Sequence, residues 1–188
     1  SHTTSHFEDT RPFDIICMGR VAVDFYAEQL YSHLKDVQSF RKYLGGCAGN
    51  TAVGAARLGL KSAMFSCVGT DEMGLFLRET LENEGVDTTL LRSTSEHLTG
   101  LVVLGVNPPD RFPLIFYREN CADMQIQPED ANPETFQKAK ALLITGTGLS
   151  TSSIREATWK AVKIAKESGC AIILDIDYRP VLWGKAEV

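Results

Sequence analysis

Asp24 and Asn50 carry side chains that can hold a ligand rich in hydroxyl groups. Asp24 comes shortly after an apolar run that ends at Gly19, and Asn50 comes shortly after the pair Gly45-Gly46. A carboxylate accepts hydrogen bonds from two hydroxyls, and an amide both donates and accepts them. Glycine has no Cβ, so a ligand can lie against the main chain at the pair. These residues are therefore candidates for binding a sugar.

Each of these residues also has a purely structural interpretation. A glycine pair before an alanine-rich helix is typical of a tight strand-to-helix turn, and the glycines taken alone favour that interpretation. Asp24 can equally cap a turn in a loop. Residue types alone leave both interpretations open.

Arg118 is a candidate for binding a carboxylate. It ends a β-rich run and follows two aromatic residues. A guanidinium binds a carboxylate through two parallel hydrogen bonds, which is the recognition that a sugar acid requires. The simpler alternative is a solvated charge paired with its neighbour Glu119.

The elements that position these residues alternate between strand and helix. Short apolar runs predict buried strands, and amphipathic stretches that end at glycine predict helices. The predicted strands cover residues 13–19, 62–68, 141–146 and 170–177, and the predicted helices cover residues 48–58, 72–84 and 150–168, with a helical connection over 128–140. The order predicts an α/β fold with a parallel sheet flanked by helices, similar to Rossmann folds.

One part of the chain interrupts this alternation. Residues 99–106 and 111–118 are β-rich and are joined by a proline-rich turn, which predicts a hairpin, and residues 39–44 predict a further exposed strand. We expect these strands to form a small β-sheet inserted beside the main sheet, a lid. A plain antiparallel extension of the main sheet is the alternative.

Composition excludes several classes of partner. The 188 residues are 44% hydrophobic and carry a net charge of −5, with no basic stripe. Nucleic acid and membrane surfaces are therefore not expected as partners. The five scattered cysteines predict free thiols in a reducing cytoplasm. Residues 1–12 are polar and predict a disordered tail.

The glycine segment as a whole resembles the first signature of the ribokinase-like (PfkB) carbohydrate kinases. The segment reads Gly-Gly-x-Ala-x-Asn-x-Ala from Gly45, and Gly59 and Gly69 follow it. The resemblance continues through Gly69-x-Asp71-x-x-Gly74 to the segment that ends at Trp183. Within the family the chain is most similar to kinases of sugar acids such as 5-dehydro-2-deoxygluconate, from inositol breakdown, and 2-keto-3-deoxygluconate.

The resemblance implies roles for particular residues. The substrate-binding residues it implies are Asp24, Gly45, Gly46, Asn50 and Arg118, and the residues near the nucleotide phosphates are Asp177 and Arg179. A C-terminal salt bridge is the simpler interpretation of Arg179. The resemblance also implies ATP and Mg²⁺ as cofactors, and a lid that covers the sugar and pairs two subunits into a homodimer.

One family motif has no counterpart in this sequence. The family takes its catalytic base from a Gly-Ala-Gly-Asp turn, which is not present here, so no catalytic residue is named. Residues 13–188 are expected to be the N-terminal, sugar-binding part of the kinase domain, without the nucleotide half. No residues are spaced as metal ligands.

Two other functions stay open. A non-catalytic sugar-binding or lid-mediated dimerisation module would use the same residues. A nicotinamide dinucleotide-binding fold is the weaker alternative, because no Gly-x-Gly-x-x-Gly follows the first strand.

Overall fold

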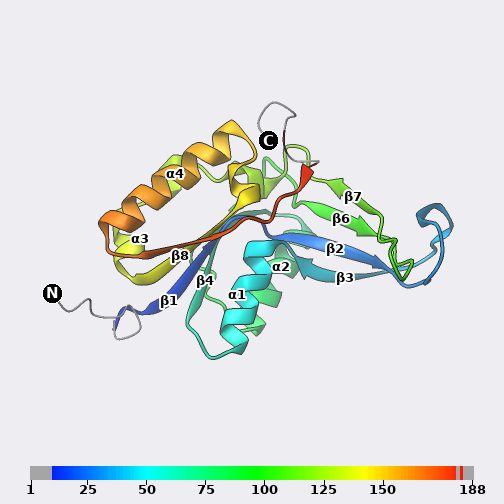
Figure 1. Ribbon diagram of the computed structural model, residues 1–188, viewed down its shortest axis with the longest axis horizontal. Helices are drawn as coiled ribbons and strands as arrows, with labels where there is room; N and C mark the ends of the chain where they lie inside the picture. The colour runs from blue at the N-terminus through cyan, green and yellow to red at the C-terminus, as the bar shows by residue number, and fades with distance from the viewer. Residues whose placement is uncertain (1–9, 181–182, 184–188) are drawn as a thin grey trace.

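The centre of the fold is a five-stranded parallel sheet (Figure 1). The computed structural model describes residues 10–180 and residue 183, so most of the predicted tail lies outside the described residues. The strands lie in the order β5 (Leu91–Thr94), β4 (Ser62–Gly69), β1 (Phe13–Met18), β8 (Ala139–Thr145) and β9 (Ala171–Asp175). All four neighbouring pairs are parallel. The four predicted strands are confirmed, and the short strand β5 was not predicted.

Helices cover both faces of this sheet. Helices α1 (Cys47–Arg57) and α2 (Glu72–Asn83) lie on one face, and α3 (Pro133–Gln137) and α4 (Ser152–Glu167) on the other (Figure 1). Alternate residues of β1 point to opposite faces: Ile15 packs with α1 and α2, and Ile16 packs with α3 and α4. Burial on both faces explains why the strands of the main sheet read as continuous apolar runs.

Local signals set the helix ends. The Asp71 side chain caps α2 by accepting hydrogen bonds from the N–H groups of Met73 and Gly74, both at 3.0 Å. The predicted connection over 128–140 is less helical than expected, because it contains only the short η4 (Pro128–Asp130) and α3 before β8 begins. Three further 3₁₀ helices are η2 (Leu34–Asp36), η3 (Ala122–Gln125) and η5 (Gly146–Leu149).

The lid is a separate four-stranded sheet at one end of the main sheet (Figure 1). Its order is β3 (Phe40–Gly45), β2 (Ala22–Ala27), β6 (Leu101–Leu104) and β7 (Leu114–Tyr117). The predicted lid strands are confirmed. Strand β2 was not predicted, and it places Asp24 within the lid sheet rather than in a loop.

The described part of the chain ends beside an exposed strand. Among the described strands β9 pairs with β8 alone, and Ile173 and Leu174 on it are 42% and 53% exposed. None of the described helices has the length and apolarity needed to span a membrane.

Candidate functional site

A cavity of about 240 Å³ lies between one face of the lid and the start of α1. Its polar lining comes from four parts of the chain, because the lid, the β1–β2 turn, α1 and the segment after β9 converge there. The polar and glycine lining residues are Arg20, Asp24, Tyr26, Gly46, Asn50 and Arg179. Parallel α/β sheets commonly bind ligands beyond the carboxyl ends of their strands, which is where this cavity lies.

Each of the two glycines of the loop lies very close to another part of the chain. A Cβ on Gly45 would lie 2.2 Å from the carboxylate of Asp24, and a Cβ on Gly46 would lie 2.5 Å from the carbonyl oxygen of Arg20. Gly46 also has φ = +95°, which disfavours other residues. Both glycines are therefore required for close packing of the chain, as their structural interpretation predicted. The group that packs against Gly45 is the Asp24 carboxylate, the candidate for ligand binding.

Asp24 is held at the cavity without a protein partner. Its Oδ1 atom is buried and has no hydrogen-bond partner among the described residues, so the turn-capping interpretation is not supported. Burial raises the pKa of the Asp24 carboxyl, and the positive charges of Arg20 and Arg118 oppose that shift. A buried acceptor without a donor indicates a site that a ligand hydroxyl can satisfy.

Asn50 lies in the first turns of α1 and also lines the cavity. The structure therefore brings the candidate residues Asp24, Gly46 and Asn50 together at one cavity. Cys47, at the start of α1, donates from its thiol to Asp175 at 2.9 Å. Burial and this hydrogen bond raise the pKa of Cys47 to about 12, so the thiol stays protonated at neutral pH.

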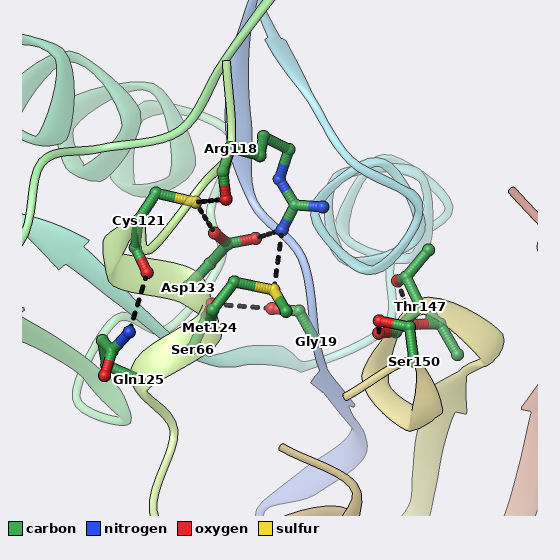
Figure 2. A network of polar contacts seen from close by, with 10 residues as sticks. Gly19, Ser66, Arg118, Cys121, Asp123, Met124, Gln125, Thr147 and Ser150 are labelled. Atoms are coloured by element: carbon green, nitrogen blue, oxygen red, sulfur yellow. Dashed lines mark hydrogen bonds and ion pairs between the residues drawn. The ribbon is translucent and has the colours of Figure 1, made fainter. Parts of the chain in front are cut away.

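Arg118 lies apart from this cavity, in a buried ion pair (Figure 2). Its Nη2 atom donates to Asp123, not to the predicted alternative partner Glu119, and also contacts the Met124 sulfur at 3.5 Å. The side chains of Arg118 and Asp123 are 3% and 1% exposed. The remaining Nε and Nη1 atoms of Arg118 have no partner among the described residues. Arg118 lines a neighbouring cavity of about 660 Å³, which shares Leu114 and Phe116 of β7 with the first cavity.

Arg179 forms the salt bridge that its simpler interpretation predicted. Its Nη2 atom lies 3.0 Å from Oδ1 of Asp177, while the other carboxylate oxygen of Asp177 is buried and has no partner within the described part of the chain. Arg179 also lines the cavity of Asp24. The predicted role of this pair toward nucleotide phosphates is not tested by these contacts.

Arg20 is the site residue that the sequence reasoning missed. It lies in the turn between β1 and β2, is 8% exposed and lines the same cavity as Asp24. The sequence feature that could have indicated Arg20 is its position as a single charged residue between two apolar stretches, with Gly19 before it and residues 21–23 after it. No group of three or more potential metal ligands occurs within the part of the chain that the structure describes.

Comparison with known proteins identifies the family. The model of a family described as pfkB family carbohydrate kinase matches residues 13–188. The chain belongs to this family. A 5-dehydro-2-deoxygluconokinase of Geobacillus kaustophilus is 36% identical over 182 residues, which cover 96% of this chain and 54% of that relative. The chain thus spans about half the length of the curated relatives it matches.

Solved structures confirm the fold. The crystal structure of a PfkB protein from Polaromonas sp. JS666 aligns with a TM-score of 0.86 at 27% identity, over 93% of this chain and 59% of that chain. A sugar kinase of Pyrococcus horikoshii, solved in complex with ATP, aligns with a TM-score of 0.83 at 31% identity, over 92% of this chain and 56% of that chain. The predicted ribokinase-like fold is therefore confirmed, and a dinucleotide-binding fold is not supported.

Proposed function

We propose that the full-length protein is an ATP-dependent kinase that phosphorylates a hydroxyl of a sugar acid of the 5-dehydro-2-deoxygluconate type, as part of inositol catabolism. The observation that carries this proposal is the cavity that combines Asp24 and Asn50 with the guanidinium of Arg20. Hydroxyl-binding groups and a buried positive charge at one cavity suit a ligand that has both hydroxyls and a carboxylate.

In this proposal the present chain holds the sugar. Asp24 and Asn50 bind hydroxyls, and Gly45 and Gly46 let the ligand lie close to the backbone. The lid sheet covers the ligand and excludes water, which strengthens each of these polar contacts.

The phosphoryl donor is proposed to be ATP with Mg²⁺, which neutralises phosphate charge during transfer. Arg179 and Asp177 lie at the edge of the sheet where they can face the phosphates. The described residues hold no metal-ligand cluster, and no step is assigned to a metal or to a catalytic base within this chain. The ATP complex of the Pyrococcus horikoshii sugar kinase supports the choice of donor.

Two further features accompany this proposal. A cytoplasmic location fits the five cysteines, all of which are free thiols. Pairing of two lids into a homodimer fits the exposed apolar side chains on the lid strands, including Tyr43 and Tyr117 at 47% and 60% exposure. The alternative of a non-catalytic module is not favoured by the family match, which extends across nearly all of the chain.

The test is a coupled ADP-release assay on the full-length protein, with 5-dehydro-2-deoxygluconate, fructose and ribose as substrates. We expect turnover with the sugar acid at a much higher kcat/KM than with either neutral sugar. Asp24→Ala and Asn50→Ala should each raise the Michaelis constant for the sugar acid. Asp110→Ala and Asn83→Ala change the same residue types at exposed positions outside the cavity and serve as matched controls. Equal activity with neutral sugars would refute the substrate class.

A further inference from the structure

We propose that Arg20 is the residue that binds the carboxylate of the substrate, because the charge of Arg118 is already compensated by Asp123. This assignment rests on the proposed sugar-acid function and makes it more specific. It moves carboxylate recognition from the lid arginine that the sequence suggested to an arginine in the β1–β2 turn.

Arg20 is a buried cation that forms no ion pair with any described residue. It is 8% exposed, and its buried Nε atom has no hydrogen-bond partner among the described residues. Its guanidinium carbon lies 5.8 Å from the centroid of the Phe116 ring. Buried charges in proteins are normally paired, because an unpaired one has lost its hydration without compensation. Since Arg20 and Phe116 both line the cavity, an anionic ligand there can supply the missing partner.

The backbone around Arg20 is fixed on both sides, so the side chain is presented in a defined place. The Arg20 carbonyl accepts a hydrogen bond from the Gly49 N–H at 3.2 Å. The preceding Gly19 carbonyl accepts one from the Ser66 hydroxyl at 2.6 Å, a bond that Figure 2 draws. The Gly19 N–H in turn donates to Phe65 at 3.2 Å. A fixed turn of this kind binds a ligand without first having to become ordered.

Arg118 differs from Arg20 in that its charge is already compensated. One end of its guanidinium donates to the carboxylate of Asp123, which also accepts from the Cys121 thiol at 2.9 Å (Figure 2). Removing either member of such a buried pair leaves the other charge uncompensated. Burial lowers the pKa of Arg20, and the positive charge of Arg118 lowers it further. The negative charges of the nearby aspartates oppose this shift. A carboxylate bound at Arg20 would relieve both effects.

The cavity also keeps the charges of Arg20 and Asp24 apart. Arg20 and Asp24 both line it, yet they form no ion pair with each other. The carboxylate of a sugar acid is attracted by Arg20 and repelled by Asp24. The hydroxyls of the same ligand can donate hydrogen bonds to Asp24. The arrangement therefore selects one orientation of the ligand in addition to its charge.

The experiment measures binding and stability separately in the full-length protein. Calorimetry compares 5-dehydro-2-deoxygluconate with its carboxamide, which lacks the charge. Urea unfolding is followed without ligand. The variants are Arg20→Met and, as the matched control, Arg118→Met. The double variant Arg118→Met/Asp123→Leu removes the buried pair as a unit, and is used because the single Arg118 variant can fail to fold.

We expect Arg20→Met to weaken binding of the acid by about tenfold to a hundredfold, the scale of a charged hydrogen bond. Binding of the carboxamide should change little, so the preference for the acid is lost. Without ligand, Arg20→Met should be as stable as the wild type or more stable, because it removes an unpaired charge. Arg118→Met should instead be less stable, and the double variant should keep the preference for the acid.

The assignment to Arg20 is overturned if Arg20→Met keeps the preference for the acid. It is also overturned if the double variant loses this preference while Arg20→Met keeps it. Loss of inorganic phosphate binding in Arg20→Met, with the acid preference intact, would likewise overturn the carboxylate assignment in favour of a phosphoryl group. A wild-type protein that binds acid and carboxamide equally well would overturn the proposed function together with this assignment. The first two outcomes leave the proposed function standing.

Discussion

Replacing Gly45 by alanine tests whether Asp24 binds the substrate without touching Asp24 itself. Gly45 lies at the end of β3, and its backbone is not in the left-handed region, so alanine fits the local conformation. The added Cβ would nevertheless lie 2.2 Å from each of three Asp24 carboxylate atoms. The perturbation is therefore directed at one side chain of the cavity.

The size of the effect follows from that distance. Ordinary contact with a Cβ begins at 3.4 Å, so the carboxylate has to move by about 1.2 Å. A misplacement of about 1 Å in a binding group can reduce activity roughly a hundredfold. Because the obstructing atoms belong to the end of a side chain, rotation of Asp24 can remove the clash. We expect the fold to survive and kcat/KM for the sugar acid to fall by about two orders of magnitude.

Gly54→Ala is the matched control. It places the same substitution in α1, where no atom lies within 4 Å of the new Cβ. Since glycine inside a helix costs about 0.5–1 kcal/mol relative to alanine, Gly54→Ala should be neutral or slightly stabilising, with unchanged kinetics. Steady-state kinetics of the full-length protein and urea unfolding of each variant separate the two effects.

A double-mutant cycle identifies the route of the effect. If Gly45→Ala acts by displacing the carboxylate, it should add almost nothing in an Asp24→Ala background, where the obstructed atoms are absent. Additive losses would mean that Gly45 contributes to binding independently of Asp24. Full activity of Gly45→Ala would refute the placement of Asp24 in the substrate site.

Three further predictions follow from other parts of the structure. Burial alone would raise the pKa of Asp71, but hydrogen bonds from Thr99 and from the start of α2 outweigh it and lower the pKa. The Asp71 carboxylate therefore stabilises the fold above pH about 4, and this stabilisation is lost as pH falls through the lowered pKa. Asp71→Ala should therefore cost about 1–2 kcal/mol of unfolding free energy at pH 7, and less in acid, by urea unfolding at both pH values. Burial raises the pKa of Asp24 in the native state above its value in the unfolded state. The wild type should therefore lose stability as pH rises from the unfolded-state pKa to the native-state pKa of this carboxyl. Asp24→Asn should lack this loss when unfolding is measured as a function of pH. Residues 1–188 alone should release no ADP in a coupled assay, because no base is placed to take the hydroxyl proton; turnover of about 1–10³ per second would contradict this.

The main sheet could be predicted because its signals are local. Strand β1 is buried on both faces, so it reads as an apolar run that needs no knowledge of its neighbours. Helix α2 carries its own cap at Asp71 and ends before Gly85, which has φ = +81°. Such elements are specified within about ten residues of sequence.

The lid was predicted only in part because its strands are specified by distant partners. Strand β2 has the mixed sequence Ala-Val-Asp-Phe-Tyr-Ala and pairs with β3 on one side and β6 on the other. Its partner β6 lies more than seventy residues away in the chain. A strand that is only partly buried and carries an aspartate does not produce a continuous apolar run, so its pattern was not recognised.

The candidate site shows the same division. Asp24, Gly45, Gly46 and Asn50 were found because their types suggest ligand binding and the loop has a recognisable motif. The partner of Arg118 was not found, because nothing in the sequence ranks Asp123 above the adjacent Glu119 until η3 places one of them in the interior. Pairing in a buried site depends on which side chain the backbone turns inward.

The two ends of the candidate ligand are set by one short segment of the chain. Arg20 and Asp24 are four residues apart, one in the β1–β2 turn and the other on β2, and the glycine pair contacts both: Gly45 lies against the Asp24 carboxylate and Gly46 against the Arg20 carbonyl. Under the proposed assignment, this segment sets the spacing between the positive and the negative group. A ligand whose carboxylate and hydroxyls match that spacing would meet both groups at once, whereas a shorter or longer acid would satisfy only one. The β1–β2 turn would then couple selection by charge with selection by length, and a series of sugar acids of increasing chain length should show one sharp optimum in calorimetric affinity that Arg20→Met flattens.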